Sequence, residues 1–258
     1  MTFYHLIKKG SCEGLVKALA RKSNTISGLY LEAYNTFLPS LLTSLINLKD
    51  LTIYFAEQHE INKDEIKEYF ATWEPPVLQN IHISGLSCFR ELAMLIENTK
   101  GNISQVSIIS AVNPENTGML VRAIANNCPN IKKLHAYIIP DDFIHIKSLL
   151  INCRSLVEVR FAKFDCYFLV SDNMCMGDEL LDILAKFSPN SLIDITIDGT
   201  WKYSTNAFEQ LFESYRERSK FNFGIYNSYF ITESHKVIVK KYVKKGVIKE
   251  TNDLFNKN

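Results

Sequence analysis

The sequence predicts an α/β solenoid in which short parallel strands alternate with helices. The main observation is a phrase of the form apolar-x-x-apolar-x-apolar, whose copies begin at Ile26, Leu48, Leu78, Ile103, Ile131, Leu156 and Leu192. The gaps between these copies are 22, 30, 25, 28, 25 and 36 residues, a mean of about 28. A recurring period in the range of about 20–50 residues indicates a stacked repeat architecture.

Each phrase predicts one strand, because its last two apolar residues alternate and therefore face the same side. Segments of helical period follow several of these strands, at 91–96, 119–125, 143–150 and 179–185. The aromatic segment 221–226 predicts a last strand, which gives seven or eight strands in all. One unit cannot bury its apolar face alone, so we expect parallel strands on a concave face and helices on a convex face.

The whole chain, residues 1–258, is expected to form a single solenoid domain of about seven to eight irregular repeats, with a capping helix and tail at 232–258. The segment 236–246 is rich in lysine and could mark a patch for nucleic acid or an anionic membrane. The alternative is the polar outer face that a terminal unit needs. Val239, Tyr242 and Val243 share one face of the predicted helix, which favours the cap.

Composition excludes several classes of protein. The 258 residues are 47% hydrophobic and 22% charged, with a net charge of +1, so no overall charge steers the chain to nucleic acid. No apolar run of about 18 residues is present, so we expect no membrane span. The N-terminus lacks the apolar run of a signal peptide, so we expect a cytoplasmic or nuclear protein.

The six cysteines, at 12, 88, 128, 153, 166 and 175, contain no C-x-x-C pair. A zinc ribbon is therefore not expected. Cys128 and Cys153 each stand three residues before the first residue of a phrase. A small thiol repeated at this place is expected to pack in the core, and the alternative is a redox or metal role.

Two junctions carry a resemblance to a known family. Residues 127–134, Asn-Cys-Pro-Asn-Ile-Lys-Lys-Leu, and 152–159, Asn-Cys-Arg-Ser-Leu-Val-Glu-Val, resemble the cysteine-containing, ribonuclease-inhibitor-like leucine-rich repeats of F-box proteins. The chain looks most like the expanded sets of such proteins in some fungi, over roughly residues 12–232. The resemblance implies a protein-binding module that selects substrates for a ubiquitin ligase. The alternative is a free-standing scaffold or inhibitor with no ligase role.

In that family a separate N-terminal F-box binds the ligase adaptor, and it opens on Leu-Pro followed by an acidic residue. The only Leu-Pro pair here is Leu38-Pro39, and Ser40 follows it. The segment 12–22 already has the pattern of a repeat helix. We therefore expect no F-box in this chain and no binding to the ligase adaptor.

The sequence holds no motif for catalysis: it lacks G-x-S-x-G, the P-loop, G-x-G-x-x-G and H-E-x-x-H. His135, Asp141, Asp142 and His145 could form a metal site. The alternative is a histidine on a strand, followed by two acids that favour the start of a helix and a histidine on that helix. We favour the alternative and expect no enzyme activity, no metal and no cofactor.

The expected binding surface is the concave face, where the residues that alternate with the buried pair point away from the core. The candidate protein-binding residues are Tyr54, His82, Gln105, Lys133, His135, Tyr137, Glu158, Arg160, Asp194 and Asp198. Any one-sided sheet shows polar residues to water, and this alternative explains much of the set. Amphipathic rings and charges of mixed sign nevertheless favour a protein ligand over nucleic acid.

We therefore expect an unidentified protein ligand, bound across the strands with Tyr137 and Arg160 near the centre of the contact. The chain itself is expected to be a monomer, with no nucleic acid and no membrane among its partners.

Overall fold

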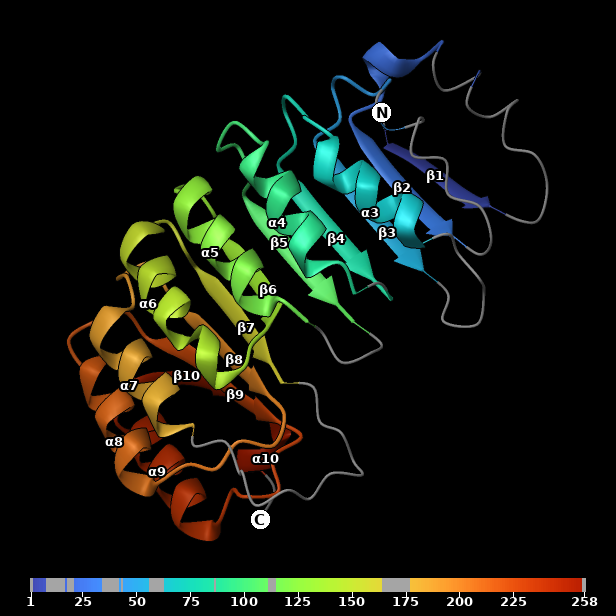
Figure 1. Ribbon diagram of the computed structural model, residues 1–258. Coiled ribbons are helices and arrows are strands. Elements are labelled where there is room, and N and C mark those ends of the chain that lie inside the picture. Colours follow the sequence, from blue (N-terminus) through green and yellow to red (C-terminus); the bar gives the residue numbers. More distant parts are fainter. Residues whose placement is uncertain are drawn as a thin grey trace.

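A computed structural model of the chain describes residues 2–7, 17, 21–33, 42, 44–55, 63–85, 87–110, 115–163 and 177–256. The Leu38-Pro39 pair and most of the segment 12–22 lie outside these residues, as do three of the six cysteines. One parallel sheet and one layer of helices make up the described part (Figure 1).

Ten strands of the described residues pair in chain order, and every pair is parallel. The strands are β1 (Thr2–Ile7), β2 (Gly28–Ala33), β3 (Asp50–Phe55), β4 (Asn80–Ser84), β5 (Gln105–Ile109), β6 (Lys133–Tyr137), β7 (Glu158–Ala162), β8 (Asp194–Asp198), β9 (Phe221–Tyr226) and β10 (Ile248–Thr251).

Helices connect the strands and lie along one face of the sheet, with the two termini at opposite ends of the stack (Figure 1). They are η1 (Ser23–Thr25), α3 (Lys63–Thr72), α4 (Phe89–Glu97), α5 (Thr117–Asn127), η2 (Pro140–Asp142), α6 (Phe143–Asn152), α7 (Asp178–Phe187), α8 (Thr205–Ser214), α9 (Glu233–Lys244) and α10 (Asp253–Asn256). From α3 to α9, consecutive α-helices pack against each other. This arrangement confirms the predicted α/β class and the parallel sheet that alternates with helices.

The strand number differs from the prediction. The phrase and the segment 221–226 correspond to β2–β9, whereas β1 and β10 add one strand at each end of the described sheet. In β10 only Ile248 is buried, and the register of its pairing with β9 shifts between Ile248 and Glu250. Such a short, irregular edge strand carries no apolar alternation that a sequence pattern could detect.

One apolar ladder runs through the middle of the sheet. Its residues pair across consecutive strands, and none is more than 2% exposed: Leu51, Ile81, Val106, Leu134, Val159 and Ile195. This confirms the register that the phrase predicts. A shift of one residue in any strand would turn these side chains to solvent.

The junction cysteines are buried packing residues, as expected. The Cys153 thiol lies 3.3 Å from the carbonyl oxygen of Cys128, and both residues end helices. Burial raises the pKa of Cys128 to about 12 and the pKa of Cys153 to about 11. Both thiols are therefore protonated near neutral pH and poor nucleophiles.

Aromatic residues fill the C-terminal end of the core. Phe208 and Phe212 of α8 pack against Phe223 of β9, and Tyr242 of α9 packs on Phe212. Val239 and Tyr242 are buried as predicted for the cap, but Val243 is 41% exposed. The predicted apolar face of this helix is therefore narrower than expected. None of the described helices is long and apolar enough to span a membrane.

Candidate functional site

Within the described residues, the helices cover one side of the sheet and leave the opposite side uncovered, and we call this side the open face (Figure 1). On β3 to β8, buried residues alternate with residues that are partly or fully exposed. All ten candidate residues occupy these exposed positions. The structure thus places the whole candidate set on one face, as the alternation predicts.

The strand register arranges the open face in rows that run across the strands. The first row holds Asp50, Asn80, Gln105, Lys133, Glu158, Asp194, Asn222 and Glu250. The middle row holds Thr52, His82, Ser107, His135, Arg160, Thr196 and Gly224. Neighbours in a row lie on adjacent parallel strands, about 4.8 Å apart. A segment of another chain that crosses the strands would therefore contact several residues of one row.

The first cluster on the open face joins three candidate residues of β6 and β7. The carboxylate of Glu158 accepts hydrogen bonds from Lys133 Nζ and His135 Nε2, each at 2.8 Å. Partial burial alone would raise the pKa of Glu158, but the hydrogen bonds from Lys133 and His135 outweigh it and lower this pKa below its ordinary value. The Glu158 carboxylate correspondingly raises the pKa of Lys133. The cluster therefore holds a stable charge pair near neutral pH.

The second cluster centres on Asp198 at the end of β8. Arg160 donates to its Oδ2 atom at 2.7 Å, and Asn227 donates to its Oδ1 atom at 2.7 Å. The Arg160 guanidinium also lies 5.7 Å from the ring centre of Tyr226. Pairs at such exposed positions contribute little to stability, so their residues stay available to a partner at small cost.

Aromatic side chains follow one another on β2, β3 and β4. The ring centre of Tyr54 lies 5.4 Å from the ring centre of Tyr30 and 5.1 Å from that of His82. Burial and the neighbouring His135 lower the pKa of His82, and its Nε2 atom has no hydrogen-bond partner within the described residues. His82 is therefore neutral at pH 7, and aromatic rings gather at this end of the open face, beside the carboxylates of Glu32 and Asp50.

Tyr137 differs from the other candidates because it also supports the core. Its hydroxyl donates to the Ser110 carbonyl oxygen at 3.0 Å, and its ring lies nearly perpendicular to that of Phe89, with the ring centres 6.2 Å apart. Burial raises the pKa of this phenol. Changing Tyr137 would thus alter stability as well as the surface, whereas Arg160 is the cleaner probe of the predicted centre.

The four residues considered as a metal site lie on different sides of the molecule. His135 is on the open face with Glu158, whereas Asp142 and His145 lie beside Gly118 on the helix side. Among the described residues, no three or more His, Cys, Asp or Glu side chains lie together as potential metal ligands. As predicted, His135 lies on a strand and His145 on a helix, whereas Asp141 and Asp142 lie in η2, directly before that helix.

Asp142 has a different role from the expected one. Its carboxylate is buried, and its Oδ2 atom accepts from Thr117 Oγ1 at 2.6 Å and from the Ile139 N–H at 2.9 Å. It therefore ties η2 to α5, and the helix dipole is not its main partner.

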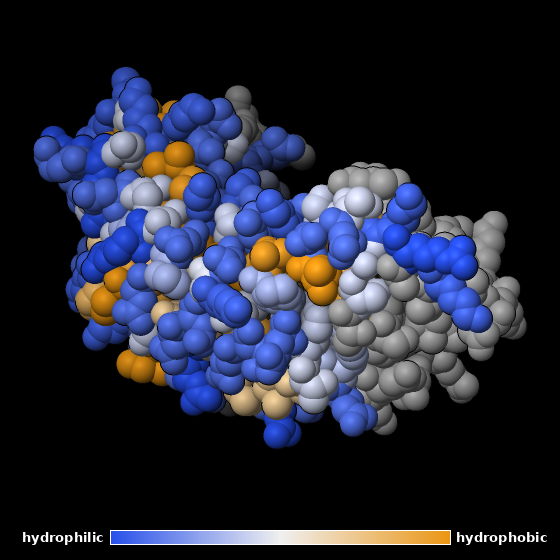
Figure 2. Space-filling view, turned by 90° about the horizontal axis from the view of Figure 1, so that it is seen from above, coloured by the Kyte–Doolittle hydropathy of each residue, from blue (hydrophilic) through white to orange (hydrophobic). Residues whose placement is uncertain are grey.

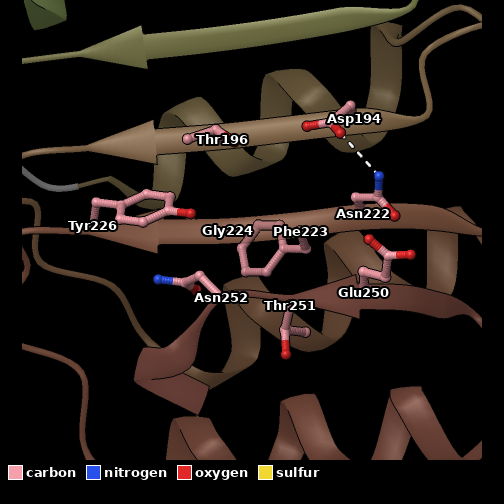
Figure 3. Close-up of a pocket in the computed structure, with 9 residues that line it drawn as sticks. All are labelled: Asp194, Thr196, Asn222, Phe223, Gly224, Tyr226, Glu250, Thr251 and Asn252. Atoms are coloured by element: carbon pink, nitrogen blue, oxygen red, sulfur yellow. Dashed lines mark hydrogen bonds between the residues drawn. The ribbon is translucent and has the colours of Figure 1, made fainter. Parts of the chain in front are cut away.

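A pocket that the sequence did not reveal lies at the C-terminal end of the open face (Figure 3). It has a volume of about 190 Å³ and is lined by Asp194, Thr196, Asn222, Phe223, Gly224, Tyr226, Glu250, Thr251 and Asn252. Among these, only Asp194 belongs to the candidate set. The alternation of Phe221, Phe223 and Ile225 could have placed Asn222 and Gly224 on the open face, but no sequence signal locates β10 beside them.

Comparisons with known proteins add no relative. A scan against known protein families found no match, and a search of curated proteins found no similar sequence.

Proposed function

We propose that this chain is a leucine-rich-repeat solenoid that binds another protein through its open face, which would be the concave face of a horseshoe. The observation that carries the proposal is the uncovered side of the parallel sheet, where polar and aromatic side chains stand in rows. The outline of the molecule is hollowed on one side, and its surface in this view is largely hydrophilic (Figure 2). Both features support a curved stack with a broad binding surface.

The chemistry of the open face favours a protein over a nucleic acid. Lys133 and Arg160 each pair with a carboxylate, so the face offers alternating signs and no continuous basic stripe. A nucleic-acid backbone would select for clustered, unpaired lysine and arginine. Mixed charges with exposed tyrosine are typical of protein interfaces.

A role in substrate selection for a ubiquitin ligase is a narrower proposal. It rests on the resemblance of the two cysteine junctions, and the buried Cys128 and Cys153 fit the packing role of such junctions. The alternative is a free-standing scaffold or inhibitor, and the repeat architecture supports it equally. Co-purification of the chain with the ligase adaptor would favour the ligase role, and we expect none for this chain.

Binding to a captured partner tests the proposal. We expect Arg160→Ala on the open face to weaken binding by more than about 1 kcal/mol, about fivefold in Kd. The matched control is Lys186→Ala on α7, which removes the cation of an exposed ion pair with Asp182 on the helix side. Titration calorimetry with the purified partner measures both variants. Loss of binding in Lys186→Ala with full binding in Arg160→Ala would contradict the proposal.

A further inference from the structure

The pocket at the C-terminal end of the open face exists because a glycine stands where the other strands carry side chains. Gly224 of β9 continues the middle row after Arg160 and Thr196. A Cβ atom at this position would lie 3.2 Å from Tyr226 Cε2 and 3.7 Å from Thr196 Oγ1, so a side chain would fill the space. Glycine inside a strand weakens the strand and often marks the close approach of a ligand or another chain.

The residues that line this pocket include two carboxylates and no cation. The carboxylates of Asp194 and Glu250 lie on either side of Asn222 in the first row (Figure 3), and none of the lining residues is Lys, Arg or His. Within the described residues, Asp194 is hydrogen-bonded to the neutral Asn222 side chain at 2.9 Å and forms no ion pair. Lys133 donates its hydrogen bond to Glu158, which raises the pKa of Lys133, and the more distant charge of Asp194 adds to this rise.

The remaining carboxylate is only loosely paired. Glu250 contacts Lys249 at 3.5 Å, and both side chains are more than 60% exposed (62% and 68%), so this pair is weak. Other carboxylates of the open face are held more tightly, since Asp198 and Glu158 have cationic partners at 2.7 and 2.8 Å. Negative groups that line a concave site focus the field and favour a cation there.

A hydrogen-bond acceptor without a partner, the Oδ1 atom of Asn222, also favours a ligand that carries donors. Asn222 uses its Nδ2 atom on Asp194, and its Oδ1 atom is shielded from solvent with no hydrogen-bond partner within the described residues. A buried acceptor without a hydrogen bond costs free energy, and a ligand whose donor reaches this acceptor removes that cost. The lining of the pocket therefore combines two carboxylates with a shielded amide acceptor, next to the ring of Tyr226, which the Arg160 guanidinium of this chain approaches to 5.7 Å.

We propose that this pocket binds an arginine side chain of the partner protein. The inference rests on the protein-binding function proposed above and names the chemistry of one contact. A guanidinium group is planar and always charged, carries five N–H donors and stacks on aromatic rings. The volume of about 190 Å³ far exceeds the roughly 30 Å³ that one water molecule takes up, so it accommodates such a head group.

A small probe tests the pocket without knowledge of the partner. The peptide acetyl-Gly-Arg-Gly-amide is titrated into the full chain, labelled with ¹⁵N, and compared with the same peptide carrying citrulline, which has the shape of arginine but no charge. We expect saturable shifts of the Gly224 amide and of the Asn222 side-chain amide with the arginine peptide. With the citrulline peptide we expect none, and added salt should weaken the arginine response.

Variants locate the site of binding. Asp194→Asn and Glu250→Gln should each weaken the arginine peptide about three- to fivefold, the effect of removing one exposed charge partner. Gly224→Ala should weaken binding by narrowing the pocket between Thr196 and Tyr226. Asp182→Asn on α7, which removes an exposed carboxylate of the helix side, should leave the affinity unchanged.

Three results would overturn the inference: equal shifts with both peptides, shifts that map to the helix side, or arginine binding that survives both Asp194→Asn and Glu250→Gln. These results are distinct from a failure of the proposed function. A captured partner that loses affinity for Arg160→Ala but binds Glu250→Gln with full affinity would refute the arginine contact and still support binding through the open face. A partner whose affinity is unchanged in every open-face variant would refute binding through this face.

Discussion

Truncation of Leu134 to alanine tests the register on which the whole stack depends. Leu134 of β6 is fully buried between Val106 and Val159 of the neighbouring strands. Removing three buried carbon groups costs about 2.4 kcal/mol in transfer free energy, at about 0.8 kcal/mol each. The cavity left between two packed strands adds to this, so we expect a loss of about 3–5 kcal/mol.

Urea unfolding followed by circular dichroism measures this loss, and thermal melting gives a second estimate. For a chain of this size the melting temperature should fall by roughly 6–20 °C. Ile109→Ala is the matched control, because it also deletes three carbon groups but from a side chain that is 47% exposed on the adjacent strand. We expect the control to cost less than about 0.5 kcal/mol. Equal losses in the two variants would refute the register.

Three further predictions concern pH, a buried carboxylate and the thiols. Burial lowers the pKa of His235 below its ordinary 6.5. As the pH drops below about 6.5, this histidine is therefore protonated more readily in the unfolded chain than in the folded chain, and the free energy of unfolding should fall. Urea unfolding at pH 7.5 and 5.5 tests this, and His235→Gln should flatten the difference. Asp142→Ala should cost about 2–3 kcal/mol because two donors lose their acceptor, whereas the exposed Asp141→Ala should cost less than about 0.5 kcal/mol by the same assay. Iodoacetamide at pH 8 should leave Cys128 and Cys153 unmodified in the folded chain and alkylate both in urea, and peptide mass spectrometry that finds either modified without urea would contradict their burial.

The sequence predicts the middle of the fold well because one physical signal repeats there. In β2 to β8 at least two alternating apolar residues are buried in each strand, and this alternation is visible in the chain itself. The edge strand β10 has no such signal, because only Ile248 of its four residues is buried. Edge strands need fewer apolar side chains, so a pattern based on burial finds the interior of a sheet more readily than its ends.

The candidate surface was predictable as a face but not as a set of contacts. Alternation places Lys133 and Glu158 on the same side, yet their pairing depends on the register between β6 and β7, which no single strand encodes. The pocket over Gly224 is harder still, since one wall comes from Glu250, about 26 residues further along the chain. The role of Gly224 in forming the pocket can be recognised only when the positions of the neighbouring strands are known.

The strictly sequential order of the strands has a consequence for how the chain folds. Each strand pairs with the next strand along the sequence, and the paired residues from β1 to β9 are between 22 and 36 positions apart in a chain of 258. The sequence separation is thus about one-tenth of the chain length, a value typical of rapidly folding helical proteins. Wide parallel sheets usually fold slowly because distant segments must first meet. Here a growing chain can add each new strand to an edge that already exists, so the sheet can assemble during synthesis from its N-terminal side.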